Sequence, residues 1–200
     1  MCSVMAAGNE VRACTVIAFS IFITWQLSGA EYVTPSSDEY DFDIRKFLNS
    51  SEKIWTLNTT SEKPQFCKSD LKRNITEQEI FFTRKSNGRE ELLHGEFLYN
   101  RAFNEYSEMN VGQTGKLLDR EEIVFHGYNN TCAVFQTTLL ANDIIFFSFN
   151  QREIVFELRV KNSSVHNPDQ ECLEQFFGYF AKGKKTQGLY FNWCQTSRMS

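Results

Sequence analysis

Two segments, each carrying a cysteine, constrain the fold of this chain most strongly. Residues 128–135 begin with an Asn-Asn turn and continue into β-branched and aromatic residues, which is typical of a strand. Residues 167–177 have the pattern of a helix that Asn167 caps. The apolar residues that recur at helical spacing are Leu173, Phe176, Phe177 and Phe180. Cys132 and Cys172 lie just inside these two elements, and a bridge between them would fix the helix to the outside of a sheet.

Most of the remaining chain alternates with the period of strands. From residue 53 onward, apolar side chains recur every second residue. The predicted strands are residues 53–60, 65–72, 78–85, 91–99, 102–111, 121–128, 131–139, 144–150 and 153–161. Eight or nine antiparallel strands in up-and-down order can close into a barrel, and a barrel of about eight strands is wide enough for one small ligand. We therefore predict an all-β fold with flanking helices.

A short helix is predicted in front of the strands, at residues 38–49. Ser37 can cap it, and acidic residues fill its first turn. One face of this helix carries Tyr40, Ile44, Phe47 and Leu48.

The first 30 residues have the pattern of a secretory signal peptide. Arg12 precedes an apolar run that ends at Trp25, and small residues at Ser28 and Ala30 suit a signal peptidase. The run is too short for a comfortable membrane span. We expect residues 1–30 to be removed and residues 31–200 to form a single secreted domain without a membrane anchor. Either Met1 or Met5 can be the start.

The cysteines and glycosylation sequons agree with an extracellular location. Four cysteines remain after residue 30, which fits two disulfides in an oxidising compartment, although spacing alone leaves three pairings open. These cysteines are Cys67, Cys132, Cys172 and Cys194. The asparagines of the expected glycosylation sequons are Asn49, Asn58, Asn74, Asn129 and Asn162.

Charge and motifs argue against several classes of function. The net charge of -4 does not suit a nucleic-acid surface, which needs a basic excess. The cysteines lack a C-x-x-C pair and there are three histidines, so we expect no metal site. The sequence has no nucleophile elbow, no zinc-protease motif and no phosphate-binding glycine loop. We therefore expect neither an enzyme nor a bound cofactor.

The order of these features resembles the tick salivary lipocalins, the histamine-binding-protein family. The residues that carry the resemblance are Trp55 on the first strand, the Tyr-Asn-x-Thr-Cys run ending at Cys132, the Glu157-Leu158 pair, the Cys-Leu-x-x-Phe run beginning at Cys172, and the late Cys194. The resemblance covers residues 41–195. The Gly-x-Trp of lipocalins at large is only half present, because Lys53 stands in place of the glycine.

The resemblance implies an eight-stranded antiparallel lipocalin barrel with a short N-terminal helix and one C-terminal helix packed outside it. It also implies the disulfides Cys132–Cys172 and Cys67–Cys194. The ligand-binding residues that it suggests are Trp55, Ala133, Phe135, Glu157 and Arg159. Trp55 is also a candidate for packing at the floor of the barrel.

The signature for amine binding in this family is incomplete here. Ala133 replaces the signature aspartate after Cys132, and Arg159 replaces the signature aromatic after Glu157-Leu158. The alternation on the last strand leaves the orientation of Glu157 open. Plain patterning places it in solvent, but a helix covering the outer face would let it point inward. If Glu157 and Arg159 both point inward, they can pair with each other.

We therefore expect a monomeric salivary protein that sequesters a small host mediator and so blunts host inflammatory or immune defence. The many phenylalanines, together with Arg159 if it points inward, favour a lipidic ligand such as a sterol, a fatty acid or an eicosanoid. The alternatives are a biogenic amine such as histamine or serotonin, and a host immune protein or cell bound at the surface. No nucleic-acid partner is expected.

Overall fold

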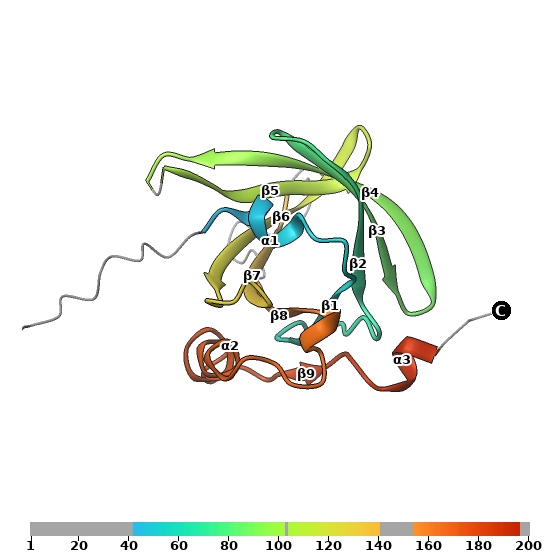
Figure 1. The fold of residues 1–200 in the computed structure, drawn as a ribbon, viewed down its shortest axis with the longest axis vertical. Coiled ribbons are helices and arrows are strands. Elements are labelled where there is room, and N and C mark those ends of the chain that lie inside the picture. Colours follow the sequence, from blue (N-terminus) through green and yellow to red (C-terminus); the bar gives the residue numbers. More distant parts are fainter. Residues whose placement is uncertain (1–41, 103, 141–153, 197–200) are drawn as a thin grey trace, which may run out of the picture. The chain divides into compact units, whose positions relative to one another are not determined.

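The structure, a computed structural model, describes residues 42–102, 104–140 and 154–196. Eight strands form an antiparallel barrel in up-and-down order, and pairing of β1 with β2 closes the ring (Figure 1). The strands are β1 (Ile54–Thr59), β2 (Ser69–Ile75), β3 (Glu79–Ser86), β4 (Arg89–Asn100), β5 (Glu105–Gln113), β6 (Lys116–His126), β7 (Cys132–Leu139) and β8 (Ile154–Lys161). A two-residue strand, β9 (Gln187–Gly188), also pairs with β1. The predicted eight-stranded barrel is confirmed, while the strand predicted at residues 144–150 lies outside the described residues.

The strand boundaries differ from the prediction most at β2 and β6. β2 begins at Ser69 rather than at residue 65, because Cys67 has a φ of 54° and leaves the extended conformation. β6 begins at Lys116 rather than at residue 121, because Gly115, with a φ of 80°, forms a tight turn that brings Lys116 opposite Gln113. Both differences come from the backbone conformation of one residue, which side-chain periodicity does not reveal.

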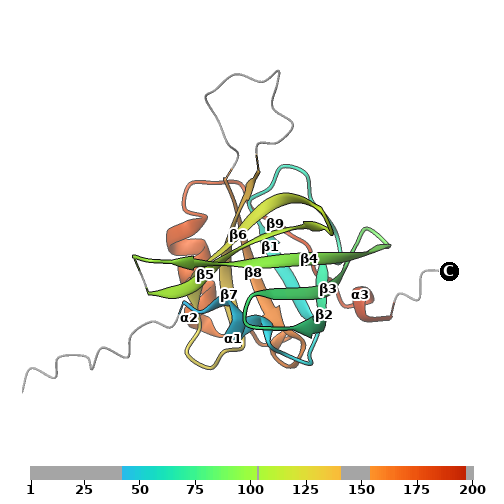
Figure 2. The same cartoon turned by 90° about the horizontal axis from the view of Figure 1, so that it is seen from above.

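A short helix, α1 (Ile44–Leu48), closes one end of the barrel. It begins later than predicted, because Asp43 caps it by accepting a hydrogen bond of 3.0 Å from the amide of Arg45. The predicted cap, Ser37, lies outside the described residues. Figure 2 shows α1 at one end of the barrel and the connection between β1 and β2 at the other. The buried apolar residues that fill the α1 end are Ile44, Phe47, Leu48, Ile54, Ile80, Phe82, Leu93, Phe97, Met109, Val111, Ile123, Ala133 and Phe135.

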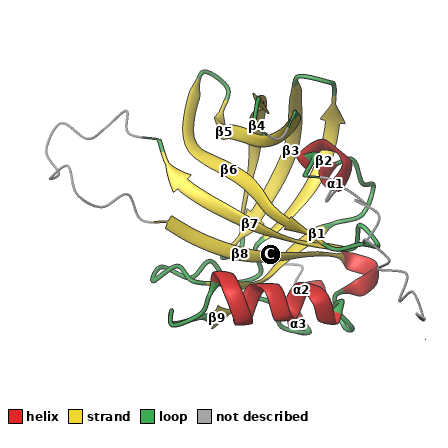
Figure 3. Cartoon of the chain, turned by 90° about the vertical axis from the view of Figure 1, so that its left-hand side faces the viewer, coloured by secondary structure: helices red, strands yellow, loops and turns green. Residues whose placement is uncertain are grey.

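The C-terminal helix lies outside the barrel, as predicted (Figure 3). It consists of α2 (Gln170–Glu174) and the π-helix η2 (Gln175–Phe180). Its N-cap is Asp169 rather than Asn167, because the Asp169 carboxylate accepts a hydrogen bond of 3.0 Å from the Glu171 amide. Phe176 is fully buried, whereas the adjacent Phe177 is 44% exposed, so the apolar face is narrower than predicted.

The helix covers apolar side chains on the outer face of β8. Leu158 and Val160 are fully buried there in a cluster with Cys172 and Phe176. Because side chains alternate along a strand, Glu157 and Arg159 on either side of Leu158 face the interior of the barrel. The question that the sequence left open for Glu157 is thereby resolved, and this side chain points inward.

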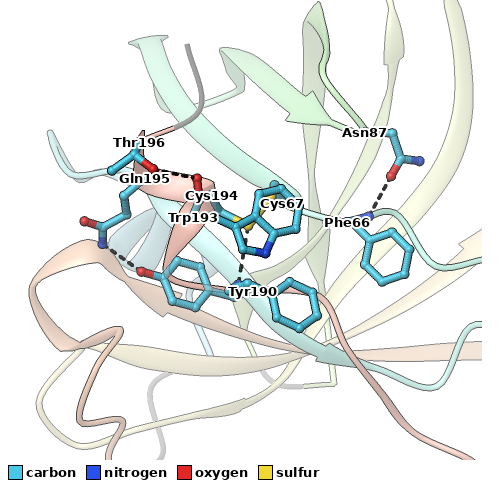
Figure 4. The surroundings of a disulfide bond; sticks show 9 residues. Phe66, Cys67, Asn87, Tyr190, Trp193, Cys194, Gln195 and Thr196 are labelled. Atoms are coloured by element: carbon cyan, nitrogen blue, oxygen red, sulfur yellow. Dashed lines mark hydrogen bonds between the residues drawn. A yellow bond between two sulfur atoms is a disulfide. The ribbon is translucent and has the colours of Figure 1, made fainter. Parts of the chain in front are cut away.

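Both predicted disulfides are present. Cys132–Cys172 joins β7 to α2, with 6.3 Å between the Cα atoms. Cys67–Cys194 joins the residue before Lys68 to the last short helix, α3 (Trp193–Thr196), with 5.3 Å between the Cα atoms (Figure 4). None of the described helices is long and apolar enough to cross a membrane.

Candidate functional site: a cavity with a charged floor

The barrel encloses a cavity of about 780 Å³ at the end opposite α1. Its wall is formed mainly by polar side chains from β1, from β3 to β8 and from the connections at this end. The polar and charged residues that line it are Thr59, Ser61, Lys63, Gln65, Lys68, Arg84, Ser86, Asn87, Arg89, Glu91, Gln113, Asp119, Glu121, Thr137 and Glu157. The apolar ones are Leu93, Val111, Leu118, Leu139, Val155 and Leu189. Among the described residues, no aromatic side chain lines the cavity.

Six charged side chains cross the interior between the cavity and the apolar core. We call Lys68, Asp70, Arg84, Glu121, Glu157 and Arg159 the charged layer. Positive and negative groups alternate through it. Lys68 Nζ lies 2.6 Å from Glu157 Oε1, and Arg159 Nη2 lies 2.7 Å from Glu157 Oε2.

The second half of the charged layer continues from Arg159. Arg159 Nη1 lies 2.5 Å from Glu121 Oε2, and Arg84 Nη1 lies 2.9 Å from Glu121 Oε1. Arg84 then pairs with Asp70 through two hydrogen bonds of 2.8 and 2.7 Å. With three cations and three carboxylates, the charged layer is balanced, and alternation places every charge beside an opposite one.

The strand register explains how these residues meet. Asp70 on β2 lies directly opposite Arg84 on β3, so the two side chains share the inner face. On β8, Arg159 lies opposite the small Ala133, which leaves room for a guanidinium. That guanidinium carbon lies 4.2 Å from the ring centroid of Phe135, so the charged layer rests on the aromatic top of the core.

Burial and pairing act against each other on the pKa of these groups. Burial alone would raise the pKa of Glu157, but Lys68 and Arg159 overcome this effect and hold the pKa at about 2. Burial would likewise raise the pKa of Glu121, which Arg159 and Arg84 instead hold well below its usual value. Glu157 and Glu121 are therefore ionised at neutral pH.

Asp119 is the exception among the inner carboxylates. It lies two residues before Glu121 on β6, on the same face and closer to the mouth of the cavity. Within the described part of the chain its carboxylate makes no hydrogen bond and no ion pair. Burial and then the nearby Glu121 raise its pKa above the usual value. Asp119 is therefore one carboxylate beyond the three that pair with the cations of the charged layer, and the other charged residues of the cavity wall are Lys63, Arg89 and Glu91.

The structure separates the five residues suggested by the resemblance. Glu157 lines the cavity, and Arg159 lies directly behind it in the charged layer. Ala133 and Phe135 are fully buried in the apolar core and do not reach the cavity.

Trp55 lies on the outer side of the wall. Its indole nitrogen donates a hydrogen bond of 2.9 Å to Asn162, the first residue of the 3₁₀ helix η1 (Asn162–Ser164), and its ring packs against Tyr190 and Val165. It packs there rather than at the floor of the barrel.

Sequence reasoning missed most of the charged layer. Its members Lys68, Asp70, Arg84 and Glu121 were not singled out, and neither was Asp119 beside them, although one signal was available. On β6, Asp119 and Glu121 continue the inner row to which Ile123 belongs, so charges follow a buried apolar residue at a spacing of two. The partners on β2 and β3 could not be assigned without the register.

Comparison with known proteins supports the fold. No family model and no curated protein matches the sequence. Among solved structures, AM182 in complex with serotonin is 16% identical with a TM-score of 0.50, and the alignment covers 74% of this chain and 90% of AM182. Japanin from Rhipicephalus appendiculatus, bound to cholesterol, is 9% identical with a TM-score of 0.48, and the alignment covers 72% of this chain and 94% of japanin. The likeness to AM182 supports, at the level of the fold alone, the lipocalin barrel that the resemblance implied.

Proposed function

We propose that the protein is a secreted lipocalin of the tick salivary type that takes up a small protonated amine in its cavity. In this proposal the ammonium group of the ligand lies against Asp119, with Glu121 behind it. The observation that carries the proposal is the carboxylate of Asp119, which faces the cavity without an ion-pair partner among the described residues. As in the sequence-based expectation, the purpose of binding is to sequester a host mediator and blunt host defence.

The balance of charge favours a cationic ligand over an anionic one. The charged layer is neutral, so Asp119 leaves the deep part of the cavity with one excess negative charge. A partly buried carboxylate without a partner is unfavourable, and an ammonium ligand would pair with it. A carboxylate ligand would add a second like charge beside Asp119. Arg159, the group expected to receive it, is already held by two glutamates.

The wall of the cavity argues against a wholly apolar ligand. The sequence favoured a lipid because of its many phenylalanines, but Phe135 packs in the core and does not line the cavity. Phe146, Phe147 and Phe149 lie outside the described residues. A sterol or acyl chain would strip water from Lys68, Arg84 and Glu157 without replacing it, which costs free energy. The described wall therefore suits a polar ligand better.

The size of the cavity suits a small molecule that carries an apolar part. A volume of about 780 Å³ falls within the usual range for ligand sites. Leu118 and Leu139 line the cavity and are 39% and 59% exposed, so they lie near its mouth. A monoamine could place its ammonium at Asp119 and its ring against these leucines. The serotonin complex of AM182 shows that a protein with this fold can hold such an amine.

Calorimetric titration of the delipidated protein tests this proposal. Histamine, serotonin, a leukotriene and cholesterol would be titrated in parallel into the wild-type protein, Asp119→Asn and the control Glu91→Gln. Glu91 also lines the cavity but is exposed. We expect an amine to bind, with an affinity about 30-fold lower in Asp119→Asn and unchanged in Glu91→Gln.

Other outcomes of the titration would contradict the proposal. Tight binding of the leukotriene or of cholesterol that is unaffected by Asp119→Asn would replace the amine with a lipid. Failure of all four ligands to bind would favour a protein-binding role in which the cavity is incidental.

A further inference from the structure

Lys68 places its own ammonium group inside the ligand cavity. The side chain lines the cavity, is 6% exposed, and reaches Glu157 with Nζ 2.6 Å from Oε1. The other carboxylate oxygen of Glu157, Oε2, already accepts hydrogen bonds of 3.0 and 2.7 Å from Arg159. Lys68 therefore occupies the remaining acceptor of a buried carboxylate, on the side that faces the cavity.

The backbone holds Lys68 in this position from both sides. Cys67 is tied to α3 by its disulfide (Figure 4). The Cys67 amide also donates a hydrogen bond of 2.8 Å to the carbonyl of Leu189. The carbonyl of Lys68 accepts a hydrogen bond of 3.0 Å from the amide of Thr56. Because the main chain is fixed at both points, the ammonium group is kept beside Glu157 at little cost in conformational entropy.

We infer that Lys68 is an internal ammonium group that occupies a cation site on Glu157 and closes this site to free amines. The ligand class of the underlying site is a primary alkylammonium ion, since that is the group that Lys68 itself presents. Lys68 would thus determine specificity by restricting a free amine to the Asp119 side of the cavity. This inference does not depend on the amine proposed at Asp119, because the Lys68–Glu157 contact is present without any ligand.

Among the cations of the charged layer, Lys68 is the one most easily replaced. Among the described residues, Arg84 contacts two carboxylates and Arg159 contacts three, whereas Lys68 contacts one. Burial lowers the pKa of Lys68 and attraction by Glu157 only partly offsets this effect, whereas the pKa of Arg159 is raised. A free ammonium ion could therefore take the place of Lys68 without disturbing the two arginines.

Chemical rescue of Lys68→Ala tests the inference. This substitution removes the side chain beyond Cβ, which corresponds to n-propylammonium in size and charge. The matched control is Lys68→Met, which also removes the charge but fills the space. Lys63→Ala serves as a second control, since it removes a cation from the cavity wall without freeing Glu157. The Tm of each variant would be measured against the concentration of n-propylammonium, with 1-propanol and KCl as additive controls.

We expect n-propylammonium to raise the Tm of Lys68→Ala by about 2–4 °C when its concentration is about five times its Kd. The Tm of Lys68→Met, Lys63→Ala and the wild-type protein should not rise by this amount, and 1-propanol should not replace the cation. The rescue should disappear in Lys68→Ala/Glu157→Gln. If Lys68→Ala is too unstable for a melting curve, the refolding yield with and without n-propylammonium provides the same comparison.

Absence of rescue in Lys68→Ala, or equal rescue in Lys68→Met, would overturn the inference. Rescue that persists in Lys68→Ala/Glu157→Gln would overturn it as well. The experiment separates this inference from the proposed function, because rescue should survive in the Asp119→Asn background. If n-propylammonium rescues Lys68→Ala but no amine binds to the wild-type protein, the inference about Lys68 is supported and only the amine proposed at Asp119 is rejected.

Discussion

Arg159 is the residue on which the interior charges depend most. Its side chain is 1% exposed and holds two carboxylates, Glu157 and Glu121, that are themselves buried. An ion pair in such a place adds little net stability compared with apolar packing, but removal of one partner leaves the others charged and without solvent. The effect of a substitution at Arg159 therefore depends on the buried carboxylates that lose their partner, Glu157 and Glu121.

We predict that Arg159→Met lowers the free energy of unfolding by about 3–5 kcal/mol, because Glu157 and Glu121 lose a shared partner. Urea denaturation at pH 7 measures this change. The double variant Arg159→Met/Glu121→Gln should be less destabilised than the sum of the two single variants, since it removes the uncompensated carboxylate together with the cation. A loss below about 1 kcal/mol in Arg159→Met would show that the charged layer reorganises more freely than its packing suggests.

Sequence patterns predict which face of a strand a side chain lies on, but not which residue it pairs with. The alternation on β8 separated Glu157 and Arg159 from Leu158, and their possible pairing followed from it. Asp70 and Arg84 belong to other strands and Lys68 precedes β2, so only the pairing of the strands brings them together with Glu157. Asp119 was missed because its importance lies in the lack of an ion-pair partner among the residues that the structure describes, and no local sequence pattern displays this.

The element that shapes the site is β8. It carries apolar side chains on its outer face and charged side chains on its inner face. The outer residues Leu158 and Val160 are fully buried beneath the C-terminal helix, while the charged residues face inward. Because the C-terminal helix buries the apolar side chains on the outer face of β8, the inner face of this strand can carry the charged residues of the charged layer. Cys132–Cys172 attaches this cover to β7.

The two disulfides should therefore have different effects when removed. Cys132→Ser/Cys172→Ser, with a sequence separation of 40, should lower the free energy of unfolding by about 4 kcal/mol in the loop-entropy view and leave ligand affinity nearly unchanged. Cys67→Ser/Cys194→Ser, with a separation of 127, should cost about 5 kcal/mol and also loosen Lys68. Urea denaturation combined with amine titration distinguishes them. Equal effects on affinity would contradict the assignment of the first disulfide to the cover alone.

The elements themselves were more predictable than their ends. Period-two alternation identified each described strand of the barrel, and the resemblance supplied its closure and the disulfide pairing. The ends of β2 and β6 were wrong by several residues, because Cys67 and Gly115 change the course of the backbone. The helix caps moved to Asp43 and Asp169 for a similar reason, since several nearby side chains could have capped either helix.

At the scale of the whole molecule, the charged layer should make stability depend on acid pH. Glu157 has a usual pKa of 4.5 that falls to about 2 in the folded protein, and Glu121 shifts in the same direction. A lowered pKa stabilises the folded state above the unfolded-state value, and this contribution disappears as the pH falls through the folded-state value. For Glu157 the contribution is about 3 kcal/mol.

We predict that the free energy of unfolding falls steeply between about pH 4.5 and pH 2, as measured by urea denaturation at a series of pH values. The decline should be shallower in Glu157→Gln, which lacks one of the titrating groups. Asp119 acts with the opposite sign, because its raised pKa makes the ionised form unfavourable in the folded protein. Asp119→Asn should therefore fold at least as stably as the wild-type protein at pH 7. A wild-type profile that stays flat down to pH 2 would contradict this account.

Secretion is a further prediction for the whole chain. Expression of residues 1–200 in insect cells should yield a monomer in the medium that begins near Glu31. Asn49, Asn74, Asn129 and Asn162 are exposed and should carry glycans, whereas Asn58 is half-buried in β1 between β8 and β9 and should be the least occupied. Peptide mapping before and after N-glycosidase treatment measures the occupancy. Retention in the membrane fraction would count against the signal peptide.

The most direct test of the amine site is the pKa of Asp119, measured from its side-chain carboxyl ¹³C shift during a pH titration. Without ligand, this pKa should lie above the usual value of 3.8. Saturating serotonin or histamine should lower it, because an ammonium group stabilises the ionised carboxylate. A pKa of Asp119 that stays unchanged while the amine binds would show that the ammonium lies elsewhere, and would contradict the proposed site.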